Sequence, residues 1–367
     1  KVNLEKTKVM VFRKGGFLSS KEKWFYGNEK LEVVNSYKYL GITMSTKMSW
    51  NIALNDRIGR AKKAVMEILK CLSRIHCNSA KVFFKMFDAQ IQPMLLYGSE
   101  IWGYTKYDSL EKVHLFACKR FLKVSLRASN NLVYGELGRH PLYINSVASC
   151  IRYWFKLLKQ PDGKYSKCAY NMLLELHNQG HVNWVTYIKN LLCSNGFAYV
   201  WAFGSVGNEK AFVNEFKNRW KDVFCQEWFS YLESKNLSGL YSEHKGCFER
   251  EKYIESIVVI NYRVALSRFR IGVSEINHHK FRYTPDADKR NCPFCPNVLE
   301  DERHVMFVCS KYTEIRQKHL NISADIPYEI QCIKLLSNKN EDIIFNVSRF
   351  IYFMLQERQK QMTNSTE

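Results

Sequence analysis

CPFCPNVLEDERHVMFVC, residues 292–309, contains three cysteines and one histidine in the pattern Cys-x2-Cys-x8-His-x4-Cys. Three thiolates and one imidazole can close a tetrahedral Zn²⁺ site. Cys292 and Cys295 are near enough in the chain to share one tight turn. His304 and Cys309 are about one helical turn apart, so their side chains can point to the same side. The pattern therefore predicts a structural zinc element, since four protein ligands leave no open position for water.

The alternative interpretation of this stretch is that the four residues are unrelated, two of them being ordinary buried thiols in a chain with 12 cysteines. The short spacings within each pair, and the length between the pairs, favour the metal site. Metal binding would fold a stretch too small to fold alone, with an apparent free energy of roughly 10 kcal/mol or more. We expect the folded element to present Lys311 and Arg316 on its surface. We expect the acidic residues 300–302 to repel phosphate from its middle.

The composition of the chain is that of a globular protein. It has 367 residues, of which 46% are hydrophobic and 14% aromatic, enough for two or three domains with a sizeable core. No run of 18 uncharged apolar residues occurs, so we expect no membrane span. The first twelve residues, KVNLEKTKVMVF, have no signal-peptide pattern and no initial Met, which suggests that further sequence lies upstream. The cysteines outside 292–309 show no pairing rhythm, which predicts a reducing, intracellular setting in the nucleus or the cytoplasm.

The formal net charge of +20 indicates a polyanionic partner. Half of this excess lies in residues 1–75, with 16 Lys and Arg against 6 Asp and Glu. Residues 252–290 add 8 basic side chains against 4 acidic ones. The alternative is that the charge serves solubility alone, because many basic proteins bind no nucleic acid.

Hydrophobic periodicity predicts short strands first and helices afterwards. We expect strands in residues 9–12 and 36–44, and a hairpin in residues 24–34 with its turn at Gly27–Asn28. From residue 50 the apolar period becomes helical, and the helix over 50–75 is basic on its outer part. Further helices are predicted at about 79–102 (with Pro93 dividing or kinking it), 109–126, 142–159, 164–178, 182–194, 208–234, 249–271 and 340–361. The fold class is therefore α+β and mainly α.

Three stretches, taken in order, resemble one known family. They are KVNLEKTKVMVF (1–12), YKYLGITM (37–44) and NYRVALSRFRIG (261–272), the last followed by the cysteine–histidine run and then Tyr312 and Arg316. The chain resembles the C-terminal half of the reverse transcriptase of LINE-type (non-LTR) retrotransposons of the jockey-like kind. By this resemblance the first stretch follows the catalytic Asp-Asp motif in the polymerase palm, and the second is the primer-grip strand.

The resemblance implies a division of the chain into six segments. These are a palm remnant with a primer-grip-like hairpin (1–48), thumb-like helices (49–130), a helical connector (131–250), an Arg-rich helix and linker (251–285), a CCHC zinc knuckle (286–320) and a C-terminal helix and tail (321–367).

The resemblance also implies nucleic-acid-binding roles for residues of the palm remnant. Lys6 and Lys8 would lie near the triphosphate of an incoming nucleotide, but without catalytic metals they would have no part in catalysis. Tyr39, Leu40 and Gly41 would form the loop that holds the primer end, because a glycine lets backbone approach a phosphate closely. The open alternatives are solvated strand lysines for the first pair and an ordinary hairpin turn for the second group.

Two basic helices complete the predicted nucleic-acid contacts. In the thumb-like helix, side chains could follow a sugar–phosphate backbone without reading sequence. In the Arg-rich helix, guanidinium groups lie near aromatic residues, a mixture that suits single-stranded RNA and unpaired ends. The alternatives are a solvated helix face in the first case and core packing in the second. The residues that we predict to bind are Arg57, Arg60, Lys63, Arg263, Arg268 and Arg270.

The chain departs from the family at its catalytic carboxylates. A polymerase palm needs aspartates that hold two Mg²⁺ ions, and the family supplies them upstream of the part that resembles residue 1. No Asp-Asp dipeptide occurs in the 367 residues. We therefore expect no catalytic residues, no Mg²⁺ site and no DNA synthesis by this chain.

The sequence predicts a remnant of a non-LTR reverse transcriptase that binds RNA or an RNA–DNA hybrid without catalysis and holds one structural Zn²⁺. Two alternatives stay open. The chain is a piece of a larger, active RNA-directed DNA polymerase whose catalytic aspartates lie upstream, or it is a retroelement-derived protein-interaction module with a purely structural zinc. The sequence does not identify a protein partner.

Overall fold

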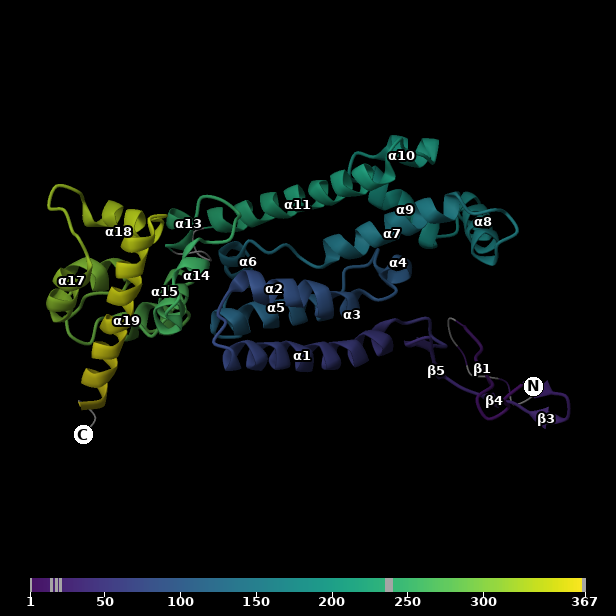
Figure 1. Cartoon of the computed structure of the whole chain (residues 1–367), viewed down its shortest axis with the longest axis horizontal. Coiled ribbons are helices and arrows are strands. Elements are labelled where there is room, and N and C mark those ends of the chain that lie inside the picture. Colours follow the sequence, from purple (N-terminus) through teal and green to yellow (C-terminus); the bar gives the residue numbers. More distant parts are fainter. Residues whose placement is uncertain (1, 14–15, 17–18, 20–21, 235–239, 365–367) are drawn as a thin grey trace. The chain divides into compact units, whose positions relative to one another are not determined.

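The computed structural model describes residues 2–13, 16, 19, 22–234 and 240–364, and this part of the chain is mainly helical with a few short strands near its N-terminus (Figure 1). The predicted α+β, mainly α class is confirmed. None of the described helices combines the length and the apolar composition that crossing a bilayer requires.

The hairpin predicted within residues 24–34 is present, and residues 36–44, which we expected to form one strand, turn back on themselves as a second hairpin. Strand β2 (Phe25–Tyr26) pairs antiparallel with β3 (Glu29–Lys30) around the Gly27–Asn28 turn, and β5 (Ser36–Tyr39) pairs antiparallel with β6 (Ile42–Ser45). The loop of the second hairpin is Leu40–Gly41, with φ angles of +46° and +81°, as a two-residue primed turn requires. The strand expected at 9–12 is shorter, because only β1 (Lys8–Val9) pairs, in parallel with β4 (Glu32–Val33).

Helix α1 (Asn51–Arg74) confirms the helix predicted over 50–75. Its buried stripe recurs at intervals of three and four residues, the spacing that puts side chains on one face of a helix. This stripe includes one charged residue, Arg57, which is only 2% exposed. The apolar members of the stripe are Leu54, Ala61, Val65, Ile68 and Leu72.

The helix predicted over 79–102 is divided into several pieces. Helix α2 (Ala80–Met86) widens into a π-helical turn, Phe87–Ile91, before α3 (Gln92–Leu96) and α4 (Ser99–Trp102). Pro93 lies in the first turn of α3, where its missing N–H costs no hydrogen bond. Gly98 then has a φ of +75°, which ends the helical run.

The helix predicted over 249–271 is also divided. It forms α14 (Tyr253–Ser256) and α15 (Ile260–Arg270), separated by residues 257–259. Ile257 and Val259 have extended backbone, with ψ angles of 100° and 105°. Three consecutive β-branched side chains at these positions favour extended backbone over helix.

The other predicted helices are found within a few residues of their expected bounds. They are α5 (Asp108–Leu122), α7 (Tyr143–Leu158), α8 (Tyr165–Asn178), α9 (Trp184–Cys193), α11 (Glu209–Glu233) and α19 (Glu341–Asn364). Additional short helices are α6 (Asn130–Leu137), α10 (Ala198–Phe203), α13 (Tyr241–His244), α16 (Asn277–Lys280), α17 (Thr313–His319) and α18 (Tyr328–Leu336).

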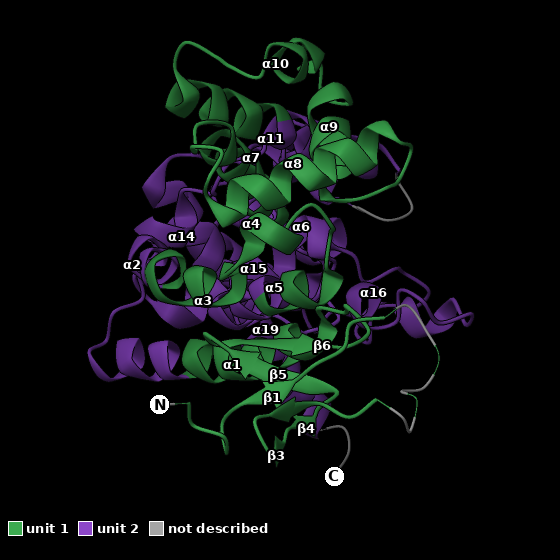
Figure 2. Cartoon of the chain, turned by 90° about the vertical axis from the view of Figure 1, so that its right-hand side faces the viewer, with its two compact units in different colours: residues 1–66, 87–113, 142–219 green, residues 67–86, 114–141, 220–367 purple. Residues whose placement is uncertain are grey.

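The chain forms two compact units, each assembled from three separate segments (Figure 2). Unit 1 contains residues 1–66, 87–113 and 142–219. Unit 2 contains residues 67–86, 114–141 and 220–367. This division does not follow the chain order of the six segments implied by the resemblance, which stay a prediction.

Unit 1 contains a close contact between helices α4 and α7. Gly103, directly after α4, lies so near Ser146 of α7 that a Cβ atom at position 103 would come within 2.9 Å of the Ser146 backbone oxygen. Further along α7, Trp154 stacks on Trp201, with the ring centres 5.6 Å apart. Only glycine allows this approach of the two backbones.

Unit 2 is organised around a buried ion pair. Arg270 Nε lies 2.7 Å from Glu136 Oε1, and neither side chain has any exposed surface. Burial alone would raise the pKa of Glu136, but the positive charges of Arg270 and Lys245 lower that pKa by more, so the carboxylate stays charged. Tyr253 Oη donates to Glu136 Oε1 at 2.6 Å, and Arg270 also donates to the backbone oxygen of Leu336. The pair thus joins α6, α14, α15 and the end of α18.

We expect replacement of Arg270 by Met to destabilise the protein by about 3–5 kcal/mol, because it leaves the Glu136 carboxylate buried without a partner. The matched control is Arg60→Met, which breaks the exposed Arg60–Asp56 pair and should cost less than about 1 kcal/mol. Urea unfolding measures both variants. Equal stability of the two would contradict this role for the buried pair.

Candidate metal centre and basic surfaces

The four predicted ligands come together in space. The side-chain donor atoms of Cys292, Cys295, His304 and Cys309 all lie within 4.8 Å of one another. The Cys309 sulfur is 4.0 Å from that of Cys292 and 3.8 Å from that of Cys295. Zn–S bonds of about 2.3 Å in a tetrahedron place sulfurs about 3.8 Å apart, so the observed separations fit zinc.

The histidine and the thiols also have the properties of metal ligands. Both ring nitrogens of His304 are buried and have no hydrogen-bond partner among the described residues, an arrangement that costs free energy unless a ligand occupies one of them. Contact with Cys309 lowers the pKa of the Cys292 thiol to about 4, and contact with Cys292 raises that of Cys309. A thiolate, which is the ligand form of cysteine, is therefore accessible at Cys292.

Cys292 and Cys295 lie on a small hairpin. Asn291 and Leu299 form an antiparallel bridge, and the Cys292 backbone N–H donates to the Val298 oxygen at 2.7 Å. The hairpin turns through Asn297, whose φ of +60° lies in the left-handed region that asparagine tolerates. The shared turn predicted for this pair of cysteines is confirmed.

His304 and Cys309 bracket a π-helical turn, His304–Val308. The Cys309 backbone N–H donates to the His304 oxygen at 2.8 Å, which is an i to i+5 hydrogen bond. This wide turn brings both side chains to one side, as the spacing predicted. Arg316, which follows in α17, fixes the turn by donating to the backbone oxygens of Met306 at 2.7 Å and Cys309 at 2.8 Å.

The expected surface of the zinc element needs correction. Arg316 is only 8% exposed, because its guanidinium is used in the hydrogen bonds to the π-helical turn. The acidic run 300–302 is largely internal: Glu300 has no exposed side chain and accepts from Arg358 Nε of α19 at 2.8 Å. Glu302 accepts from the buried ring of His279 at 2.8 Å. These carboxylates anchor the metal element to the rest of unit 2 and do not form a surface that repels phosphate.

Sequence reasoning missed Arg358 and His279 as partners of the metal element. Arg358 lies 58 residues beyond Glu300, and no local pattern connects the two positions. The sequence around His279 gave no sign of its buried position, since a His-His dipeptide in a basic stretch is typical of a surface linker. Its ring lies between Ser274 Oγ at 2.7 Å and Glu302 Oε1 at 2.8 Å.

The predicted palm residues differ in how accessible they are to a ligand. Lys6 is exposed, whereas Lys8 Nζ lies 2.5 Å from Glu32 Oε2, so a carboxylate already neutralises its charge. The Tyr39–Leu40–Gly41 stretch is the tip of the β5–β6 hairpin, and Leu40 is 73% exposed there. Tyr97 holds this tip, since its hydroxyl donates to the Leu40 oxygen at 3.1 Å.

The two basic helices turn several of their arginines inward. Arg57 packs against the Tyr97 ring, with its guanidinium carbon 5.3 Å from the ring centre, and is buried. Arg263 is buried over the Phe121 ring and donates to the Ile254 oxygen at 3.1 Å. Together with Arg270, these side chains are occupied by internal contacts, so burial argues against their predicted role in binding nucleic acid.

The remaining predicted basic residues are accessible. Arg60 and Lys63 are exposed on the outer face of α1, and Arg60 Nη2 lies 2.8 Å from Asp56 Oδ2. No described carboxylate lies within ion-pair distance of Lys63. Arg268 is half-buried on α15, where its Nε donates to the Lys123 oxygen at 2.9 Å and leaves its two terminal nitrogens available.

Comparison of the chain with models of protein families, with curated proteins and with solved structures gave no match. The resemblance to reverse transcriptases therefore rests on the three sequence stretches alone.

We expect the purified protein to contain about one zinc per chain and Cys292→Ser to contain none, because three ligands hold Zn²⁺ far more weakly than four. Elemental analysis after gel filtration measures the ratio. Cys332→Ala is the matched control, since Cys332 is another buried thiol of unit 2 that is no part of the cluster. Full zinc content in Cys292→Ser would mean that the ligands are other residues.

Proposed function

We propose that this chain is a non-catalytic remnant of a non-LTR reverse transcriptase that binds single-stranded RNA or an RNA–DNA junction, with one structural Zn²⁺ at the CCHC site. The zinc element provides rigidity. It supplies no reaction, because all four tetrahedral positions belong to protein side chains.

The observation that carries the proposal is the contact of the β5–β6 tip with Tyr97, next to α1 in unit 1. Tyr39 and Tyr97 are 56% and 52% exposed, so each offers a ring surface. Tyr97 also contacts Arg57 of α1, the helix that carries the exposed cations Arg60 and Lys63. Accessible rings near cations suit single strands, in which bases stack on rings and phosphates pair with cations. We call these four exposed residues, Tyr39, Arg60, Lys63 and Tyr97, the tip–helix surface.

The net charge of +20 also supports RNA binding, because it attracts a polyanion whatever its orientation. The exposed ion pairs on α1 do not oppose it strongly. Pairs such as Arg60–Asp56 and Lys70–Glu67 are weak at the surface, and a phosphate can displace the carboxylate.

The second candidate function is that of a protein-interaction module without a nucleic-acid role. The inward positions of Arg57, Arg263 and Arg270 favour it, since these residues stabilise the fold and offer no charge to a partner. A third possibility, that the chain is part of an active polymerase, requires catalytic aspartates upstream. The reading frame upstream of Lys1 tests that possibility directly.

We expect affinity for a single-stranded RNA of about 20 nucleotides to fall at least about tenfold between 50 and 200 mM salt, because cation–phosphate contacts release counterions. Fluorescence anisotropy measures the affinity. The absence of measurable binding at the lower salt concentration would contradict the proposal and favour the protein-interaction module.

We expect Arg60→Gln combined with Lys63→Gln to lower this affinity about fivefold or more at constant salt, since two phosphate contacts are lost. The control Lys156→Gln combined with Lys159→Gln removes the same charge from exposed positions of the same unit, at the end of α7. Equal losses in the two double variants would show that binding depends on total charge and not on the tip–helix surface.

A further inference from the structure

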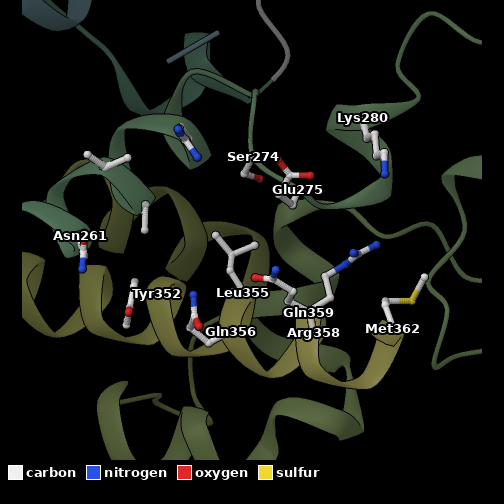
Figure 3. A pocket seen from close by; sticks show the side chains of 13 residues that line it. Asn261, Ser274, Glu275, Lys280, Tyr352, Leu355, Gln356, Arg358, Gln359 and Met362 are labelled. Atoms are coloured by element: carbon white, nitrogen blue, oxygen red, sulfur yellow. The ribbon is translucent and has the colours of Figure 1, made fainter. Parts of the chain in front are cut away.

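Unit 2 contains a cavity of about 500 Å³ between α15, α19 and residues 274–280 (Figure 3). This volume is in the range of small-molecule sites. Helix α19 forms one side of the cavity with Tyr352, Gln356, Gln359 and Met362. These residues are spaced by three or four positions, so they share one face of the helix.

The charge of the cavity is positive. Arg268 and Lys280 both line it, and Glu275 is the one carboxylate among its lining residues. Arg358 also lines the cavity, but its charge is already matched by Glu300. The Arg268 side chain is held in place by its hydrogen bond to the Lys123 oxygen, which orients its free nitrogens before any ligand arrives.

The walls of the cavity are preformed. Ser274, which lines it, is tied to His279 and through it to Glu302 by hydrogen bonds of 2.7 and 2.8 Å. On the opposite side, Tyr352 packs against Tyr262 with ring centres 5.1 Å apart, which restrains the ring. A ligand would therefore meet fixed groups and would lose little binding free energy to their ordering.

We propose that this cavity binds one nucleotide of a single-stranded RNA. Arg268 and Lys280 receive the phosphate, for which a fixed guanidinium and an ammonium are suited. The amides of Gln356 and Gln359 each offer donors and an acceptor to the polar edge of a base, and Tyr352 offers a ring edge or face to it. The proposal rests on the proposed RNA binding, and it adds a second site that lies in unit 2.

The same chemistry would bind a free nucleoside monophosphate. We favour a nucleotide within a strand, because the many cations of the chain would attract the flanking phosphates, which a free nucleotide lacks.

The first experiment compares Lys280→Gln and Gln356→Ala with Lys360→Gln in RNA binding by anisotropy. Lys360 is exposed on α19 but does not line the cavity, so it controls for loss of one charge. We expect each cavity variant to weaken binding about three- to tenfold and the control less than twofold. All three substituted residues are exposed, so the folds should remain intact. If the wild type binds RNA and the cavity variants behave as the control does, the cavity proposal is wrong and the proposed function stands.

The second experiment locates the nucleotide directly. RNA containing 4-thiouridine is irradiated with the protein, and mass spectrometry identifies the attached peptides. We expect adducts at Tyr352 or Met362, reduced by Gln356→Ala. Adducts confined to other parts of the chain would overturn the proposal. Excess uridine monophosphate should leave these adducts unchanged; their loss would identify the free nucleotide as the ligand and would overturn the assignment to a strand.

Discussion

The ion pair between Glu136 and Arg270 is the constraint on which unit 2 depends. Two opposite charges lie 2.7 Å apart where no water reaches them, and each would be costly to bury alone. The same guanidinium also lies 3.3 Å from Glu251, whose other oxygen contacts Lys245. Segments from distant parts of the sequence must therefore come together for any one of these charges to be accommodated. Arg270 of the Arg-rich helix therefore stabilises the fold of unit 2.

The metal centre depends on a second set of buried charges. The ligands themselves come from one stretch of 18 residues, but its hairpin is attached to α19 through Glu300 and Arg358, and its π-helical turn is fixed by Arg316. A metal bound by four side chains would close the local structure. The ion pair and hydrogen bonds then determine how that local structure is held in unit 2. This arrangement explains why acidic residues occur between the two ligand pairs of a strongly basic protein.

The local features of this chain could be predicted, and its long-range contacts could not. The four ligands, the Gly27–Asn28 turn and the bounds of most long helices follow from spacing and periodicity, whereas periodicity did not indicate that residues 36–44 turn back at Leu40–Gly41. The predicted nucleic-acid contacts that burial argues against are those of arginines, because charge alone does not tell which face of a helix a residue occupies. A signal was present for Arg57, which falls at three- and four-residue intervals from Leu54 and Ala61 in the apolar stripe. The partners Arg358 and Lys123 carry no such signal, since contacts formed by loop closure over long distances leave no local pattern.

The assembly of each unit from three separated segments has a consequence for synthesis on the ribosome. Residues 1–66 and 87–113 cannot complete unit 1 until the segment that ends at residue 219 has emerged. Unit 2 must wait longer still, because Glu136 is translated well before Arg270 and the metal ligands come later again. For that interval the early basic segments stay without their final partners, exposed to whatever polyanions and chaperones surround the nascent chain. Residues 67–86 and 114–141, the early segments of unit 2, therefore wait longest for the segments with which they pack.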